Sequence, residues 1–188
     1  MKNLKIPFDR KELEELKAGE MVTLTGTLYT GRDAVHKRWM SRLDRGEDLG
    51  FPIENACIYY VGPTPSKEGE PIGSCGPTSS YRMDDFTPRL LDLGLAGMIG
   101  KGRRSPEVIE SIKKNKAVYF TAIGGSAAKL KASVVSCEII DYPDLGAEAV
   151  RHLEVKDFPV TVTIDSKGNN LYELGKDAYL NSLKEADK

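Results

Sequence analysis

Hydrophobic and polar positions alternate along this chain with more than one period. Residues 21–29 (MVTLTGTLY) place apolar side chains at every second position between threonines, which is the pattern of a half-buried strand. Residues 160–164 and 171–174 flank a glycine-containing turn and predict a β-hairpin. Short apolar segments typical of buried strands lie at residues 56–61, 95–99, 117–121 and 134–140.

Helix signals separate these strands. Asp9 is a favourable N-cap for an opening helix that Gly19 ends, and Asp33 is a favourable N-cap for a second helix. Ser105 followed by Pro106 is typical of a helix start, because serine caps the helix and proline fits its first position. The sequence therefore predicts a helix between most pairs of successive strands.

Other helices are expected in less regular parts of the chain. One runs from Asp84 or Asp85 to about Asp92, with Pro88 tolerated only in its first turn. Shorter helical segments are expected after a glycine-rich loop at residues 124–126, near residue 147, and around residues 179–183.

The alternation of strands and helices indicates the fold class. The chain contains no internal repeat, no low-complexity tract and no linker long enough to separate two domains. Its 188 residues are enough for one domain to bury a full core. We therefore expect a single mixed α/β domain over residues 1–188, with a partly antiparallel sheet.

Charge and cysteine content narrow the possible functions. The chain has 27 Lys and Arg residues against 28 Asp and Glu residues, so no overall positive field favours nucleic acid or an anionic membrane as a partner. Its three cysteines are widely spaced and form no Cys-x-x-Cys pair, so no disulfide framework, zinc site or self-contained iron–sulfur site is indicated. Without a signal-peptide pattern or an apolar segment of membrane length, the sequence predicts a cytoplasmic protein.

Residues 73–85 (GSCGPTSSYRMDD) are rich in glycine and hydroxyl side chains and contain almost nothing apolar. The glycines and the proline favour tight turns, and the hydroxyl groups are donors that a bound anion requires. Arg82 adds a planar, permanent positive charge suited to a carboxylate or a phosphate. The alternative is a solvated turn that precedes a helix.

Two more cations follow predicted strands. Arg32 stands where the alternating strand ends, and Lys101, flanked by two glycines, follows the strand at residues 95–99. Loops beyond the carboxyl ends of strands gather at one edge of an α/β sheet, where ligands bind. Converging there with Arg82 and the hydroxyl of Thr78, these cations would hold two carboxylates. The alternative is three unrelated surface charges.

Histidine and cysteine give weaker signals. His36 lies near the start of a predicted helix and is expected to be a surface or partner-contact residue rather than a base. The cysteines are expected to be small buried hydrophobic residues, and only Cys75 falls within the polar stretch.

Four segments in order resemble motifs of class I iron–sulfur hydro-lyases. They are residues 30–36 (TGRDAVH), 60–65 (YVGPTP), 73–84 (GSCGPTSSYRMD) and 99–102 (IGKG). The likeness continues through residues 154–159 and 165–169 and so covers nearly the whole chain. The chain resembles the β subunit, or carboxy-terminal half, of class I fumarate hydratase, and it is similar to the β subunit of L-tartrate dehydratase.

The resemblance implies a three-layer fold of the swivelling β/β/α type. It implies a hydro-lyase that reversibly hydrates fumarate to L-malate, a step of the tricarboxylic acid cycle. It also implies a [4Fe-4S] cluster ligated by three cysteines of the other subunit or half. The partner would then be a cluster-binding α subunit in an α2β2 heterotetramer, and this chain would supply no metal ligand.

The resemblance also assigns roles to four residues of this chain. Arg32, Arg82 and Lys101 correspond to ligands of the substrate carboxylates, and Thr78 corresponds to the proposed base that removes a proton beside a carboxylate. Fumarate and L-tartrate both stay open as substrates, because the same cations would hold either four-carbon dicarboxylate. A non-catalytic anion-binding module is the remaining alternative.

Overall fold

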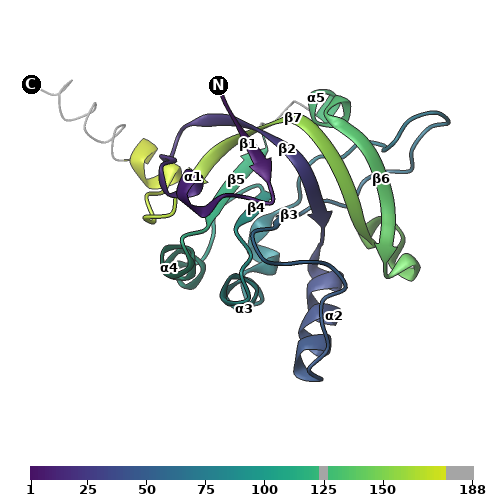
Figure 1. The fold of residues 1–188 in the computed structure, drawn as a ribbon, viewed down its shortest axis with the longest axis horizontal. Coiled ribbons are helices and arrows are strands. Elements are labelled where there is room, and N and C mark those ends of the chain that lie inside the picture. Colours follow the sequence, from purple (N-terminus) through teal and green to yellow (C-terminus); the bar gives the residue numbers. More distant parts are fainter. Residues whose placement is uncertain (123–126, 177–188) are drawn as a thin grey trace, which may run out of the picture.

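The computed structural model describes residues 1–122 and 127–176, whose strands form one mixed sheet (Figure 1). The sheet order is β1-β2-β3-β4-β5-β7-β6. Neighbouring strands from β1 to β5 are parallel, and β7 is antiparallel to β2, β5 and β6. The mixed α/β class is thus confirmed. The strands are β1 (Lys2–Ile6), β2 (Met21–Thr30), β3 (Cys57–Tyr59), β4 (Gly97–Gly100), β5 (Val118–Ala122), β6 (Val134–Asp141) and β7 (Val150–Ile164).

Strand β7 closes the sheet into a five-stranded ring. It pairs with β2 along most of its length and with β5 near its end, so the ring runs β2-β3-β4-β5-β7 and returns to β2. Register shifts in both pairings, one of them between Leu24 and Gly26, mark irregularities of the kind that bend a strand and increase its twist. This closed ring is not the layered swivelling β/β/α arrangement that the resemblance implies. The physical reason is the length of β7, whose 15 residues reach both sides of the ring.

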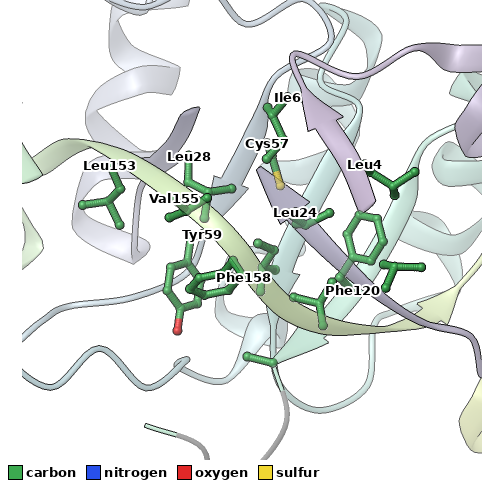
Figure 2. Close-up of a cluster of buried hydrophobic side chains, with 14 of the residues drawn as sticks. Leu4, Ile6, Leu24, Leu28, Cys57, Tyr59, Phe120, Leu153, Val155 and Phe158 are labelled. Carbon is green, nitrogen blue, oxygen red and sulfur yellow. The ribbon is translucent and has the colours of Figure 1, made fainter. Parts of the chain in front are cut away.

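The two sides of the ring bury different hydrophobic clusters. Inside it, side chains of β1, β2, β3, β5 and β7 pack together, among them Leu24, Phe120 and Phe158 (Figure 2). Outside it, the intervening residues of β3 to β5, such as Ile58 and Tyr119, pack against the helices. Because successive side chains of a strand point to opposite faces, both faces of these strands are apolar.

The helices lie outside the ring, with α2, α3 and α4 together below the sheet in Figure 1. Asp9 caps the first helix and Ser105 caps α4, as predicted, each by accepting a hydrogen bond from a backbone N–H. No helix of the described residues is long and apolar enough to cross a membrane. The α-helices are α1 (Arg10–Glu14), α2 (Asp33–Asp44), α3 (Thr87–Asp92), α4 (Pro106–Asn115) and α5 (Ala127–Ala132), and the 3-10 helices are η1 (Ser80–Met83) and η2 (Pro143–Glu148).

The predicted hairpin near the carboxyl end is wrong. Strand β7 begins at Val150 rather than at residue 160, and residues 171–176 are helical instead of forming a second strand. The turn itself exists, because Asp165 accepts hydrogen bonds from the backbone N–H groups of Lys167 and Asn169. Asn170 then accepts from the N–H of Tyr172 at 3.1 Å and so starts a helix.

Three other expectations need correction, and two more concern residues that the structure does not describe. A strand, β1, precedes the opening helix, because Leu4 and Ile6 are buried in the ring beside β2. Asp33 is the first residue of α2, whose N-cap is Arg32. No continuous helix starts at Asp84, since η1 and α3 are separate. The loop at residues 124–126 and the helix around residues 179–183 lie outside the described residues.

Candidate active site

The parallel strands β2, β3 and β4 deliver three segments to one edge of the sheet (Figure 1). Arg32 follows β2 after a single glycine, Gly62 lies shortly after β3, and Lys101 follows β4 immediately. Because the strands are parallel neighbours, their carboxyl ends meet here, as the sequence predicts for this class of sheet.

The hydroxyl-rich stretch runs along the same edge. The N–H of Thr78 donates to the carbonyl of Tyr60 at 2.8 Å, just beyond β3. Ser79 pairs with Lys101 in a parallel bridge, and the N–H of Ser80 donates to the carbonyl of Lys101 at 2.9 Å. The structure therefore brings the backbones of Thr78 and Lys101 onto neighbouring segments.

Gly100 allows this close approach. A Cβ at Gly100 would lie 1.9 Å from Oγ of Ser80 and 2.8 Å from Cδ2 of Tyr60. Ser80 is buried, its hydroxyl is 2.8 Å from the hydroxyl of Tyr119, and the latter donates to the carbonyl of Gly102 at 2.9 Å. Gly100 thus serves the packing of this edge, whereas Gly102 contributes its carbonyl group to it.

A buried ion pair ties the segment of Arg82 to the segment of Lys101. Arg104 Nε lies 2.6 Å from Asp84 Oδ1, and the other carboxylate oxygen accepts the N–H of Ser105 at 2.7 Å. Burial, the largest influence, lowers the pKa of Arg104, but the facing Tyr60 and Asp84 outweigh it and raise that pKa above its ordinary value. Arg104 therefore stays charged, and its pair with Asp84 fixes η1 against the loop after β4.

Sequence reasoning missed Arg104. It expected a helix to start at Asp84 or Asp85, whereas the Asp84 carboxylate bonds to Arg104 and to the N–H of Ser105 at the start of α4. The signal in the sequence was limited to the position of this arginine, directly before the Ser105-Pro106 helix start.

Arg32 lies in a partly buried position beside two carboxylates. Its side chain is 25% exposed, and its Nε lies 3.2 Å from Oε1 of Glu148 and 3.9 Å from Oδ1 of Asp33. A Cβ at Gly62 would lie 2.9 Å from Nη1 of Arg32 and 3.2 Å from its Cδ. The arginine thus packs over Gly62, with Glu148 at its side.

His36 holds the backbone from which Arg32 projects, and the expectation of a surface or partner-contact residue is wrong. His36 is completely buried, in contact with Trp39, Tyr60 and Phe86. Its Nδ1 lies 2.8 Å from the carbonyl of Arg32, which assigns the ring proton to Nδ1. Burial is the largest cause that lowers the pKa of His36, to about 4, so the ring is neutral at physiological pH.

Arg82 and Lys101 are exposed at this edge. Arg82 lies on η1 after Tyr81, whose side chain is 66% exposed. In the described part of the chain, neither cation forms an ion pair, and no hydrogen bond or ion pair joins any two of Arg32, Thr78, Arg82 and Lys101. The backbone pairings place three of the candidates on adjoining segments and Arg82 on the next turn.

The cysteines of this chain do not fit an iron–sulfur cluster. Among the described residues no group of three or more His, Cys, Asp or Glu side chains could hold a metal ion. Cys57 and Cys75 are buried in the core, and burial raises the pKa of both thiols, that of Cys75 to about 11. Cluster ligation requires thiolates, so these environments oppose it.

Four cavities, of about 300 to 580 Å³, have linings that include none of Arg32, Thr78, Arg82 and Lys101. Arg82 and Lys101 are exposed, so water would be excluded from them only if another surface covered this edge.

Comparison with known proteins gives a consistent result. The model of the family described as Fumarase C-terminus matches residues 2–175. The aerobic class I fumarate hydratase of Salmonella typhimurium is 39% identical over 165 residues, which are 87% of this chain and 28% of that protein. Fumarate hydratase 2 of Leishmania major is 38% identical over 90% of this chain and 31% of its own length. A putative L(+)-tartrate dehydratase subunit beta of Methanocaldococcus jannaschii is 37% identical over 87% of both chains.

The chain thus spans about a third or less of the fumarate hydratases it matches, but most of the tartrate dehydratase subunit.

Proposed function

This chain belongs to the fumarase C-terminus family, and we propose that it is the β subunit of an iron–sulfur hydro-lyase that reversibly hydrates fumarate to L-malate. In this proposal, Arg32, Arg82 and Lys101 bind the substrate carboxylates, and Thr78 moves the carbon-bound proton. The observation that carries it is the pairing of Ser79 with Lys101, which sets Thr78 beside a cation at the sheet edge that Arg32 also occupies.

The three cations suit the charge that develops in the reaction. Removing the proton beside a carboxylate places negative charge on that carboxylate, and fixed cations stabilise it in the transition state. Arg32 and Arg82 present planar forks that can hold carboxylate oxygens in a bidentate manner, whereas Lys101 supplies a compact charge. Together they would hold both ends of a four-carbon dicarboxylate.

Thr78 could transfer a proton only if a neighbouring group stabilised its deprotonated hydroxyl. Its backbone N–H is occupied by Tyr60, and its half-buried hydroxyl accepts and donates no hydrogen bond within the described residues. A threonine hydroxyl is a poor base at its ordinary pKa, so a neighbouring positive charge has to stabilise the alkoxide. The ammonium of Lys101, on the adjoining segment, is the group we assign to this task.

The [4Fe-4S] cluster belongs, in this proposal, to a partner α subunit. The cysteines here do not fit it, and the exposed edge around Arg82 and Lys101 requires a covering surface. The longer relatives carry about 70% of their length outside the part that this chain matches, which is room for such a subunit in the same polypeptide. We propose an α2β2 heterotetramer for the separate-chain form.

L-tartrate is the second candidate substrate. The observation that favours it is length, because the Methanocaldococcus jannaschii tartrate dehydratase subunit is matched over 87% of both chains. The proposed cations do not separate the two substrates, since each is a four-carbon dicarboxylate. We place fumarate first because most of the relatives compared above are fumarate hydratases.

An anaerobic assay tests the proposal. The chain is coexpressed with a candidate cluster-bearing subunit, supplied with iron and sulfide, and tested with L-malate, fumarate and L-tartrate. We expect hydration of fumarate and dehydration of L-malate by the complex, and none by this chain alone. Turnover of tartrate only would select the second candidate. A complex that binds dicarboxylates without turnover would leave the anion-binding module as the explanation.

A further inference from the structure

Arg32 is contacted by a carboxylate that sequence reasoning did not find. Oε1 of Glu148 lies 3.2 Å from Nε of Arg32, and both side chains are about three-quarters buried. Both atoms are buried and neither forms a hydrogen bond within the described residues, so the contact is an ion pair without hydrogen-bond geometry. Glu148 is the nearer of the two carboxylates beside Nε of Arg32, because Oδ1 of Asp33 lies 3.9 Å away.

Glu148 is held in place by the end of β2, the strand that precedes Arg32. It is the last residue of η2, and the adjoining Ala149 is buried. The hydroxyl of Thr30, at the end of β2, donates to the carbonyl of Ala149 at 3.2 Å and accepts the N–H of Arg151 at 2.8 Å. The two residues of the ion pair are thus attached to backbones that are bonded together.

The residues around η2 make this support rigid. The guanidinium group of Arg151 donates to the carbonyls of Gly146, Ala147 and Ala149. These bonds occupy the carbonyl groups at the end of the 3-10 helix, which would otherwise need water. Glu148 therefore projects from a fixed turn.

The geometry suits a positioning role. An arginine has one donor at Nε and four at its two Nη groups. A carboxylate placed at Nε restrains the rotation of the side chain and leaves Nη donors for a second carboxylate. Gly62 lies against the other side, near Nη1 and Cδ, so the guanidinium group is limited from two directions.

We propose that Glu148 is a positioning residue, which orients Arg32 for the substrate carboxylate. This inference rests on the proposed function, because it assigns to Arg32 a dicarboxylate as ligand. Glu148 itself touches no substrate in this scheme. It acts through Arg32. Because Glu148 already restrains the Arg32 side chain, less conformational entropy is lost when the substrate binds.

Kinetics of Glu148→Gln in the assembled enzyme tests the inference. Loss of the charge should raise KM for L-malate roughly 3- to 10-fold, which is the cost of ordering one long side chain, and leave kcat within about 2-fold. The melting temperature should stay close to that of the wild type. The matched control is Asp144→Asn on the same 3-10 helix. Asp144 forms an exposed ion pair with Arg38, which is not a candidate site residue, so this variant should leave KM unchanged.

A double-mutant cycle distinguishes positioning from a general structural effect. In an Arg32→Ala background, Glu148→Gln should change KM no further, whereas a structural defect would add to the loss. An unchanged or lower KM for Glu148→Gln in an active enzyme would overturn this inference alone, a lower value meaning that Glu148 competes with substrate for Arg32. A wild-type complex without hydro-lyase activity would overturn the proposed function and this inference with it.

Discussion

The α-carbon of Gly62 packs against the side chain of Arg32, so closely that a Cβ at Gly62 would lie 2.9 Å from Nη1 and 3.2 Å from Cδ of the arginine. The atom in the way is the end of a flexible side chain rather than backbone. An added methyl group would therefore displace the guanidinium group and leave the fold in place.

Gly62→Ala should consequently impair catalysis more than stability. We expect kcat/KM of the assembled enzyme to fall roughly 10-fold, as for a weakened charged hydrogen bond of about 1.5 kcal/mol, with a free energy of unfolding within about 0.5 kcal/mol of the wild type. Steady-state kinetics and urea unfolding measure the two quantities. Gly175→Ala, where the added methyl group meets no atom of the described residues within 4 Å, is the control. Equal kinetics for the two variants would contradict the prediction.

Gly100→Ala, in contrast, should impair stability more than catalysis. The added Cβ would overlap Oγ of Ser80 at 1.9 Å and the ring of Tyr60 at 2.8 Å, and both residues are completely buried. Overpacking of this kind costs about 1–3 kcal/mol or more, and urea unfolding of the isolated chain would measure it. Ser80→Ala in the same chain removes the closest atom and should restore part of the stability. If the double variant is no more stable than Gly100→Ala, the contact with Ser80 is not the cause.

Local patterns predicted the elements whose signals lie within a few residues. The Asp9 cap, the Ser105-Pro106 helix start and the alternation over β2 all depend on neighbouring side chains, and the structure confirms them. The hairpin failed because the course of β7 depends on strands β2, β5 and β6, which are distant in sequence. A short apolar segment such as residues 171–174 is compatible with either a strand or a helix. Here the side chain of Asn170 accepts the N–H of Tyr172 and starts a helix.

The candidate site was predictable in part for the same reason. Arg32 and Lys101 stand at strand ends, and the sheet topology brings strand ends together. Arg104 and Glu148 gave no comparable signal, because each acquires its partner only through the folded chain. The prediction that His36 is exposed was wrong because α2 directs this side chain into the interior, where it contacts Trp39 and Tyr60. The roles of Arg32, Thr78, Arg82 and Lys101 stay predictions, which kinetics can test.

The arginines of the site should not tolerate lysine. Arg32→Lys and Arg82→Lys keep the net charge but replace a planar fork with a compact ammonium group. We expect kcat/KM to fall roughly 10-fold or more in each variant, consistent with loss of about 1.5–3 kcal/mol for a charged hydrogen bond. Arg38→Lys, which changes an exposed ion pair with Asp144, should behave as wild type. Unaltered kinetics in either site variant would place that arginine outside the site.

His36 should make stability depend on pH. Its pKa is lowered by burial from 6.5 to about 4, so between these values the unfolded chain binds a proton that the folded chain does not. Stability should therefore fall as pH decreases from about 6.5 to about 4, by up to about 3 kcal/mol from this group. Above pH 6.5 and below pH 4 the two states carry the same charge at this residue, and the contribution no longer changes.

Urea unfolding of the wild type, His36→Asn and His152→Asn over this pH range isolates the effect. Asparagine can still donate to the carbonyl of Arg32 but does not titrate, so His36→Asn should lose the extra pH dependence even if it is less stable at pH 7. His152→Asn, which changes the only other histidine of the chain, should keep it. Parallel curves for the wild type and His36→Asn would show that burial of His36 does not control this pH dependence.

Thr78 allows proton transfer to be separated from binding. Its backbone N–H donates to the carbonyl of Tyr60 whatever the side chain is, and its hydroxyl caps no helix among the described residues. Thr78→Ala should therefore leave the free energy of unfolding within about 0.5 kcal/mol of the wild type. If the hydroxyl moves the proton, kcat should fall roughly 100-fold or more with little change in KM, because the cations still bind the substrate while assistance in the transition state is lost. Thr78→Ser keeps a hydroxyl at the same position and should retain part of the activity. Steady-state kinetics with L-malate, beside a thermal melt of each variant, measures both effects, and an unaltered kcat for Thr78→Ala would exclude Thr78 as the base.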